Sequence, residues 1–160
     1  MRVAINGLGF RLGYLGHVFR EMDPDFQIVG YYDPAPAGMA VLQEHGIPAG
    51  KSYDSAEALV RAGGFDLLMI GSPNHLHLDH IRLGLEAGVK VFSEKPIVSS
   101  IAQTYELAAL LGKHGSENLL VGLVLRYAPL YHDLLAARDS GALGKIVSIE
   151  EQDIAGFRLE

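Results

Sequence analysis

The stretch NGLGFRLG, residues 6–13, decides the fold, because its glycines separate a short apolar run from a longer amphipathic one. The apolar run is RVAIN at 2–6, which has the length and composition of a buried strand. Gly7 permits a tight turn, and Gly9 permits another group to approach the backbone closely. Because the N–H groups at the start of a helix attract anions, the stretch predicts a strand–turn–helix unit that holds a phosphate group.

The spacing departs at its third position from the GxGxxG pattern of dinucleotide-binding loops. The third glycine of that pattern falls on Leu12, and Gly13 follows one place later. Because this glycine normally permits close packing of helix on strand, either the loop is one residue longer or the helix lies farther out. A strand-to-helix turn that binds no dinucleotide is the alternative.

Apolar runs alternate with amphipathic ones along most of the chain. Strands are predicted at 2–6, 26–33, 66–72, 89–94 and 118–126, with a shorter one near 51–53. Helices are predicted between them, at about 13–22, 36–45, 55–62, 75–87 and 99–114, with Asp54 or Ser55 and Ser99 or Ser100 as N-caps. Such alternation predicts a doubly wound α/β fold, with a parallel sheet covered on both faces and right-handed crossovers.

The composition is that of a globular protein, with 49% hydrophobic and 20% charged residues among 160. The length gives room for one ordinary domain. The formal net charge of −6 argues against a nucleic-acid partner and against an anionic membrane surface, because both need clustered Lys and Arg. The sequence has no apolar run of membrane-spanning length, no signal-peptide pattern and no cysteine, so we expect a soluble cytoplasmic protein.

Asp33 ends the second predicted strand, where an acid would accept hydrogen bonds from the adenosine ribose hydroxyls of a dinucleotide. No Lys or Arg follows Asp33 until Lys51, so the 2′-phosphate of NADP would meet repulsion without a cation nearby in sequence. We therefore predict NAD as the cofactor and regard NADP as disfavoured. Arg11, inside the glycine loop, qualifies this choice, since it could reach a phosphate of either cofactor.

The last part of the chain has a different pattern. Residues 127–144 predict a helix that starts near Pro129 and ends in a glycine-rich turn. KIVSIEEQD, at 145–153, alternates apolar and polar residues as a strand with one wet face does. We predict a dinucleotide-binding domain at 1–126, then a connecting helix and the first strand of a second α+β domain at 127–160. Most of that second domain would be absent, so the chain is expected to be part of a longer protein.

Three further segments carry a family resemblance, and they are SPNHLH at 72–77, SEKPIVSS at 93–100 and LRYAPLYHDLLAARDSGALGKIVSIE at 125–150. With them, essentially the whole chain resembles the N-terminal part of the glucose–fructose oxidoreductase/inositol dehydrogenase/MocA-like family. Glu94-Lys95-Pro96 is the most telling element. The resemblance implies a Rossmann domain that binds NAD(P). It also implies hydride transfer between the nicotinamide cofactor and a sugar, cyclitol or similar polyol.

The resemblance assigns roles to residues. Lys95 matches the lysine that contacts substrate and supports catalysis, and a cation there would stabilise an alkoxide developing on the substrate. Pro96 often takes a cis bond at this place, and Arg126 and Tyr127 match a pair near the substrate side. The cofactor-binding residues implied by the loop and the resemblance together are Gly7, Leu8, Gly9, Phe10, Arg11, Leu12, Asp33, Ser72, Pro73, Asn74, His77, Glu94, Lys95 and Arg126.

The family also supplies an Asp and an acid–base His from its second domain, and their expected place lies beyond Glu160. The chain by itself should therefore bind cofactor better than it turns over substrate. Family members often associate through the sheet of the second domain, so we expect the full-length protein to be a homo-oligomer. The alternatives are a non-catalytic NAD-sensing or scaffold protein of the same fold and an NAD-dependent glycosidase of the same family.

The stretch SPNHLHLDH, at 72–80, also contains the HxHxDH spacing of a zinc hydrolase signature. Such a site needs its first two histidines on a non-helical turn, but Pro73 and Asn74 predict the start of a helix. On a helix His75 and His77 lie about 200° apart, so they cannot share one ion. We therefore predict no metal site, and we place His77 near the cofactor.

Overall fold

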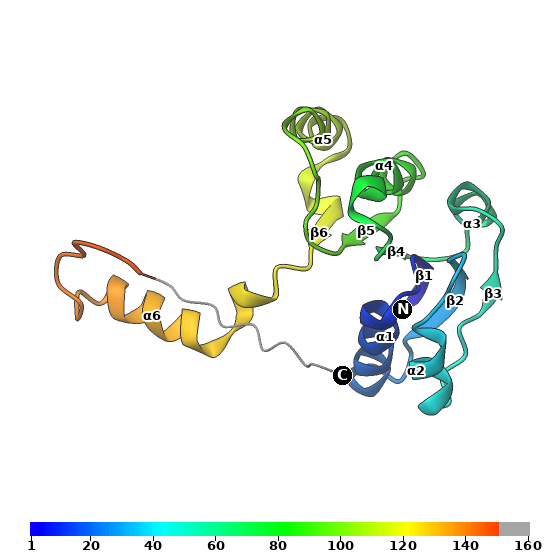
Figure 1. Ribbon diagram of the computed structural model, residues 1–160, viewed down its shortest axis with the longest axis horizontal. Coiled ribbons are helices and arrows are strands. Elements are labelled where there is room, and N and C mark those ends of the chain that lie inside the picture. Colours follow the sequence, from blue (N-terminus) through cyan, green and yellow to red (C-terminus); the bar gives the residue numbers. More distant parts are fainter. Residues whose placement is uncertain (151–160) are drawn as a thin grey trace. The chain divides into compact units, whose positions relative to one another are not determined.

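The computed structural model describes residues 1–150, and it divides after Gly122 into two compact units, the second starting at Leu123. The first unit is a parallel six-stranded sheet with the order β3-β2-β1-β4-β5-β6 (Figure 1). The strands are β1 (Arg2–Asn6), β2 (Gln27–Tyr32), β3 (Lys51–Ser52), β4 (Leu67–Ile70), β5 (Lys90–Ser93) and β6 (Leu119–Val121). This topology confirms the predicted doubly wound α/β fold.

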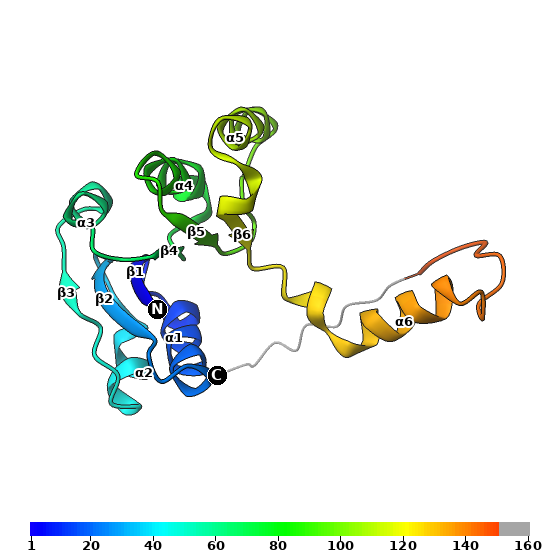
Figure 2. The same ribbon diagram turned by 180° about the vertical axis from the view of Figure 1, so that it is seen from behind.

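Helices cover both faces of the sheet, as Figures 1 and 2 show from opposite sides. They are α1 (Phe10–Met22) and α2 (Met39–Glu44) on one face, and α3 (Ala56–Ala62), α4 (His77–Glu86) and α5 (Ile101–His114) on the other. Because side chains alternate along a strand, Val3 and Ile5 of β1 join the core beneath α1 and α2, while Ala4 joins the core on the opposite side. Among the described residues no helix combines the length and hydropathy of a membrane span.

Side-chain caps set the starts of two helices on one face. Ser55 Oγ accepts a hydrogen bond of 3.1 Å from the Ala58 amide, and Ser100 Oγ accepts one of 3.2 Å from the Gln103 amide. These serines, rather than Asp54 and Ser99, are therefore the N-caps. Several predicted glycines stand just past helix ends with positive φ, and they are Gly46, Gly63 and Gly88.

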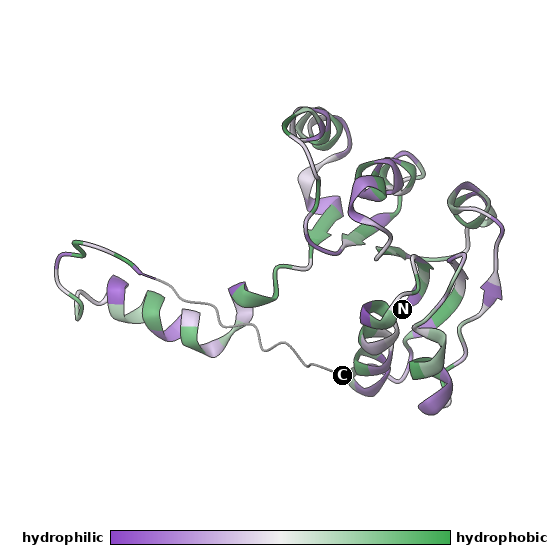
Figure 3. Cartoon of the chain, in the orientation of Figure 1, coloured by the Kyte–Doolittle hydropathy of each residue, from purple (hydrophilic) through white to green (hydrophobic). Residues whose placement is uncertain are grey.

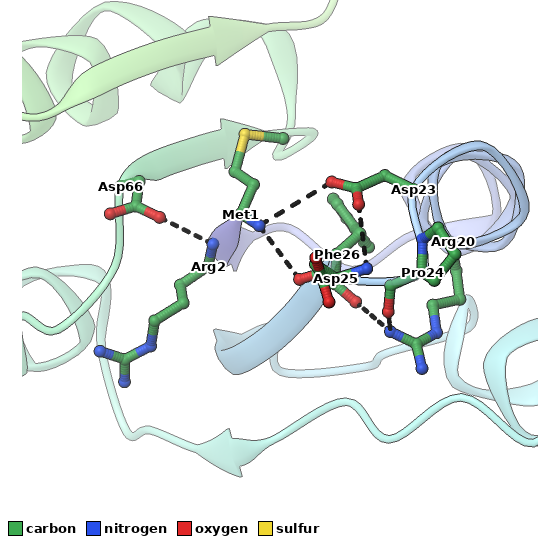
Figure 4. Close-up of polar contacts among 8 residues, drawn as sticks. All are labelled: Met1, Arg2, Arg20, Asp23, Pro24, Asp25, Phe26 and Asp66. Carbon is green, nitrogen blue, oxygen red and sulfur yellow. Dashed lines mark hydrogen bonds and ion pairs between the residues drawn. The ribbon is translucent and has the colours of Figure 1, made fainter.

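The amino ends of the strands are fixed by a set of backbone and charged contacts (Figure 4). The Met1 amino group donates to the Asp25 carbonyl at 3.0 Å, and the Arg2 amide donates to Asp66 Oδ2 at 2.8 Å. Arg20, from the end of α1, donates to the carbonyls of Pro24 and Phe26 in the turn before β2. These contacts join β1, β2 and β4 at the edge away from the glycine loop.

The second unit holds a 3-10 turn, η3 (Val124–Tyr127), and the helix α6 (Pro129–Asp139), which has Pro129 in its first turn as predicted. Figure 3 shows hydrophobic and hydrophilic residues interspersed along α6. Within the described residues of this unit, Val147 and Ile149 are 88% and 84% exposed.

Two predicted strands differ from the structure. The strand predicted at 118–126 is reduced to β6, because it pairs with β5 only from Leu119 to Val121 and the chain then turns into η3. The strand predicted at 145–153 is wrong for its described part, because residues 145–150 form no strand. A strand needs a neighbour for its hydrogen bonds, and the described chain supplies none there. Residues 151–153 of that prediction lie outside the described part.

Candidate functional site

Four adjacent strands end level with one another at the carboxyl edge of the sheet. Asn6 of β1 pairs with Tyr32 of β2 and with Ile70 of β4, and Ile70 pairs with Ser93 of β5. The residues that follow each strand therefore meet at this edge. Connections leave β1 toward β2 on one side and return to β4 on the other, so the edge between β1 and β4 is the topological switch point where ligands of such folds bind.

A crevice of about 280 Å³ opens at the switch point. It is lined by the ends of β1, β2 and β4 and by the turn into α4, with the residues Asn6, Gly7, Tyr32, Asp33, Pro34, Gly71, Ser72, Pro73, Leu76 and His80. Four of the predicted cofactor-binding residues are among them, and they are Gly7, Asp33, Ser72 and Pro73. The crevice thus joins the glycine loop to the acid at the tip of β2.

Gly7 makes the tight turn after β1. Its φ is +89°, and a Cβ on it would lie 2.2 Å from the backbone nitrogen of Ser72. Its amide donates to the Tyr32 carbonyl at 2.8 Å. Only glycine fits this place, because the backbone conformation and the neighbouring turn each exclude a side chain. The close approach brings the glycine loop against the turn that follows β4.

The missing third glycine is compensated on the facing strand end. Helix α1 begins at Phe10 with Gly9 as its N-cap, and the Leu12 side chain is completely buried. A Cβ on Gly71 would lie 2.7 Å from Leu12 Cδ1, so Leu12 occupies the space that Gly71 leaves. Gly13 instead permits contact with the loop before α2, since its Cβ would lie 2.5 Å from the Gly38 carbonyl oxygen. Helix α1 therefore still packs closely on the sheet, with the large residue, Leu12, on the helix and the small residue, Gly71, at the facing strand end.

The remaining loop residues divide by exposure. Leu8 and Leu12 are fully buried core residues, so the structure does not bring their side chains to the crevice. Phe10 is 69% exposed, and the Arg11 side chain is about half exposed. Leu8 and Leu12 therefore expose no side chain whereas Phe10 and Arg11 do, and the cofactor-binding roles of all four stay predictions.

Asp33 follows β2 directly and is partly buried. Its Oδ1 accepts a hydrogen bond of 2.7 Å from the Ala35 amide, which fixes the carboxylate at the strand tip. Asp33 lines the crevice together with Ser72 and Pro73. Among the described lining residues of the crevice there is no Lys or Arg. Asp33 is the one acidic residue in the described lining of the crevice.

His77 lies beneath the crevice edge rather than in the open. It is 1% exposed, its Nδ1 is 2.7 Å from the Pro96 carbonyl oxygen and its Nε2 is 2.8 Å from the Ser72 carbonyl oxygen. Carbonyl oxygens only accept, so a neutral ring donates to one of them and a doubly protonated ring donates to both. This arrangement engages both ring nitrogens with the backbone, and the placement of His77 near the cofactor stays a prediction.

His80 also lines the crevice, one turn along α4. Its Nδ1 is 2.9 Å from Ser72 Oγ, and both residues are buried. Burial lowers the pKa of His80 below its ordinary value, and nearby His77 lowers it further, against the opposing effect of Glu57 and Asp79. Sequence reasoning did not assign His80 to the site. Its position three residues after His77, on the buried face of α4, was the available signal.

Glu94 and Lys95 follow β5 at the same edge. Glu94 is 9% exposed, and its Oε1 accepts a hydrogen bond of 3.1 Å from Arg11 Nε, which links the start of α1 to the end of β5. Lys95 is exposed, and the Lys95–Pro96 peptide bond is cis, as the family pattern predicted. The structure thus brings Arg11 and Glu94 together, a pairing that the sequence did not reveal.

Asn74 starts the 3-10 turn η1 (Asn74–Leu76) and is exposed at the same edge, whereas Arg126 belongs to η3 of the second unit. The role of Arg126 in cofactor binding stays a prediction. No group of three or more His, Asp or Glu placed to hold a metal ion occurs in residues 1–150. The two side-chain polar atoms of Asn6 are buried without a hydrogen-bond partner at the crevice floor.

Residues 1–123 match the family model described as "Oxidoreductase family, NAD-binding Rossmann fold". The chain belongs to this family. Its members include an inositol 2-dehydrogenase/D-chiro-inositol 3-dehydrogenase from Lactiplantibacillus plantarum, 24% identical over 94% of this chain and 43% of that protein. They also include a D-xylose 1-dehydrogenase (NADP(+)) from Haloferax volcanii, 33% identical over 69% of this chain and 33% of that protein.

A solved member of the family has the same arrangement of strands and helices. The scyllo-inositol dehydrogenase from Lactobacillus casei, crystallised with NAD(H) and scyllo-inositol, matches with a TM-score of 0.75 and 25% identity. The match covers 90% of this chain and 42% of that one. The chain therefore spans less than half the length of these family members.

Proposed function

We propose that this chain is the cofactor-binding part of an NAD-dependent oxidoreductase that acts on a sugar, cyclitol or similar polyol. The observation that carries the proposal is the crevice at the switch point, where Asp33 meets Gly7, which lies two residues before the N-cap of α1. In such folds, backbone N–H groups of the first turn hold a diphosphate and the acid at the second strand holds a ribose. Bound there, the cofactor would supply a nicotinamide ring that accepts or donates a hydride.

The charges of the crevice favour NAD over NADP. Asp33 is fixed at the strand tip by Ala35, and the described lining contains no cation to pair with a 2′-phosphate. Arg11, the residue that could have reached a phosphate, is paired with Glu94 on the β5 side of the edge. A 2′-phosphate would thus face a carboxylate alone, although a relative such as the D-xylose dehydrogenase carries NADP in its name.

Lys95 is the residue that we assign to the substrate. It is exposed at the carboxyl edge, directly after the buried Glu94. A cation at this edge would orient a substrate hydroxyl and stabilise the alkoxide that develops during hydride removal. In the full-length protein, we expect Lys95→Ala to abolish most turnover and to leave NAD affinity within about twofold. Unchanged turnover would remove Lys95 from the mechanism. We also propose that the full-length protein is a homo-oligomer.

The test of cofactor binding is calorimetric titration of the chain with NAD, NADP and ADP-ribose. We expect NAD and ADP-ribose to bind and NADP to bind more weakly. Asp33→Asn should weaken NAD by roughly tenfold to a hundredfold, because a hydrogen bond to a charged group contributes about 1.5–3 kcal/mol. The same change should narrow the preference for NAD over NADP, since it removes the repulsion between the Asp33 carboxylate and the 2′-phosphate of NADP.

The matched control is Glu86→Gln, which removes one exposed negative charge near the C-terminus of α4, at the opposite edge of the sheet. It should leave all three affinities unchanged. If Asp33→Asn and Glu86→Gln had equal effects, general charge rather than the strand-tip carboxylate would explain binding. Absence of NAD and ADP-ribose binding by the unmodified chain would refute the proposal.

A further inference from the structure

His77 makes two contacts that join separate turns at the carboxyl edge. One ring nitrogen faces the Ser72 carbonyl in the turn after β4, and the other faces the Pro96 carbonyl in the turn after β5, at 2.8 Å and 2.7 Å. The residue itself starts α4, so a single side chain connects three elements. Both partners are backbone atoms. The contacts therefore depend on the paths of the two turns and not on the identity of their side chains.

The imidazole ring of His77 is buried, and this makes its two contacts costly to lose. His77 is 1% exposed, so water does not compete for its nitrogens. Losing a buried polar partner is costly, because the group left behind stays desolvated. A carbonyl that accepts a hydrogen bond from the ring would be left in this state if the imidazole were replaced by a hydrocarbon ring.

The two turns carry different parts of the site. The turn at 72–74 lines the crevice through Ser72 and Pro73, while the turn at 94–96 carries Lys95. We propose that His77 is a positioning residue that ties these two turns together and so fixes Lys95 relative to the crevice. The inference rests on the proposed function, because the position of Lys95 matters only where a dinucleotide occupies the crevice. In this role His77 acts through the two turns and not by contact with cofactor or substrate.

Three substitutions separate the two contacts. His77→Phe keeps a buried ring and removes both nitrogens. His77→Asn places a donor near the position of Nδ1 and can keep the Pro96 contact alone. His77→Gln reaches the position of Nε2 and can keep the Ser72 contact alone. His75→Phe is the matched control, because His75 lies two residues away in the same segment and is exposed.

The first measurement is amide hydrogen exchange in the chain without cofactor, which tests the tie independently of the proposed function. His77→Phe should speed exchange by at least about tenfold in both 72–76 and 94–97. His77→Asn should speed exchange at 72–76 only, and His77→Gln at 94–97 only. His75→Phe should leave both segments as they are. Equal, uniform changes across the sheet in all three variants would show general destabilisation and would overturn the proposal.

The second measurement is turnover together with NAD affinity in the full-length protein. His77→Phe should lower kcat by about tenfold, because Lys95 is no longer held in place, and leave NAD affinity within about twofold, as expected for Lys95→Ala. Unchanged turnover, or a loss of NAD affinity as large as the loss of turnover, would contradict the positioning role. If His77→Phe does not fold, the opposite exchange patterns of the Asn and Gln variants still decide. If the unmodified chain binds neither NAD nor ADP-ribose, the proposed function fails while the exchange result stands.

Discussion

Gly7→Ala tests whether the carboxyl edge is built as described. The substitution places a methyl group on a backbone with φ +89°, 2.2 Å from the Ser72 nitrogen and 2.5 Å from the Gly71 carbonyl carbon. The backbone conformation alone costs about 1–2 kcal/mol for an L-residue. Displacing the packed turn after β4 adds about 1–3 kcal/mol. Together these terms predict that the free energy of unfolding falls by roughly 2–5 kcal/mol.

The matched control is Gly46→Ala. Gly46 also has a positive φ, +64°, but a Cβ there would meet no atom within 4 Å. Gly46→Ala should therefore cost only the conformational part, about 1–2 kcal/mol. Urea unfolding of the two variants, followed by circular dichroism at matched protein concentration, measures the difference. If both variants lose the same stability, the turn after β4 does not press on Gly7, and the described geometry of the crevice is wrong.

Three further predictions concern single contacts. Because the fold lowers the pKa of His80 from its ordinary value of about 6.5, the unfolded chain binds more protons than the folded chain as the pH falls through that value. The free energy of unfolding should therefore decrease there and level off below the folded pKa. His80→Asn, which keeps a group near Nδ1 for Ser72, should flatten this profile in urea unfolding between pH 7.5 and pH 5.5, about one unit either side of the ordinary pKa. In the same urea unfolding assay, Leu12→Ala should lower the free energy of unfolding by about 2–5 kcal/mol and Gly71→Ala should lower it by about 1–3 kcal/mol. The double variant should lose less than the sum of the two, because the methyl group added at position 71 fills space that the shortened residue 12 leaves. Ser100→Ala should lower the free energy of unfolding by about 1 kcal/mol, because α5 loses its N-cap. An unchanged midpoint of urea unfolding would show that the cap does not contribute to stability.

The order of strands and helices could be predicted because local patterns determine it. Buried strands of a parallel sheet are apolar on both faces, and serines and glycines mark the helix ends. Asp33 was predictable for the same reason, since it follows a strand and precedes a turn. The end of β6 was not, because its apolar residues continue past Gly122 while its pairing partner β5 ends at Ser93. The apolar pattern of one strand does not indicate where the strand that pairs with it ends.

The contacts within the site were less predictable, because they join residues that are distant in sequence. Arg11 and Glu94 are 83 positions apart, and each has an ordinary isolated role, one as a loop cation and the other as a motif acid. Leu12 looked like a defect in the loop, and only the facing Gly71 shows how it is accommodated. For His77, helical spacing indicated which face it occupies but not that its partners would be two carbonyls.

Some residues of the crevice should affect both the stability of the fold and the binding of cofactor, whereas others should affect binding alone. At Gly7 the two are inseparable, because the close approach that shapes the proposed anion site is also the packing of β1 against the turn after β4. At Asp33 they are separable, because an asparagine can still accept the Ala35 hydrogen bond while losing the charge that we propose to face a ribose. Gly7→Ala should therefore lower both the unfolding free energy and NAD affinity, whereas Asp33→Asn should lower affinity alone. Calorimetry and urea unfolding on the same two preparations would reveal whether this division holds, and a large stability loss in Asp33→Asn would contradict it.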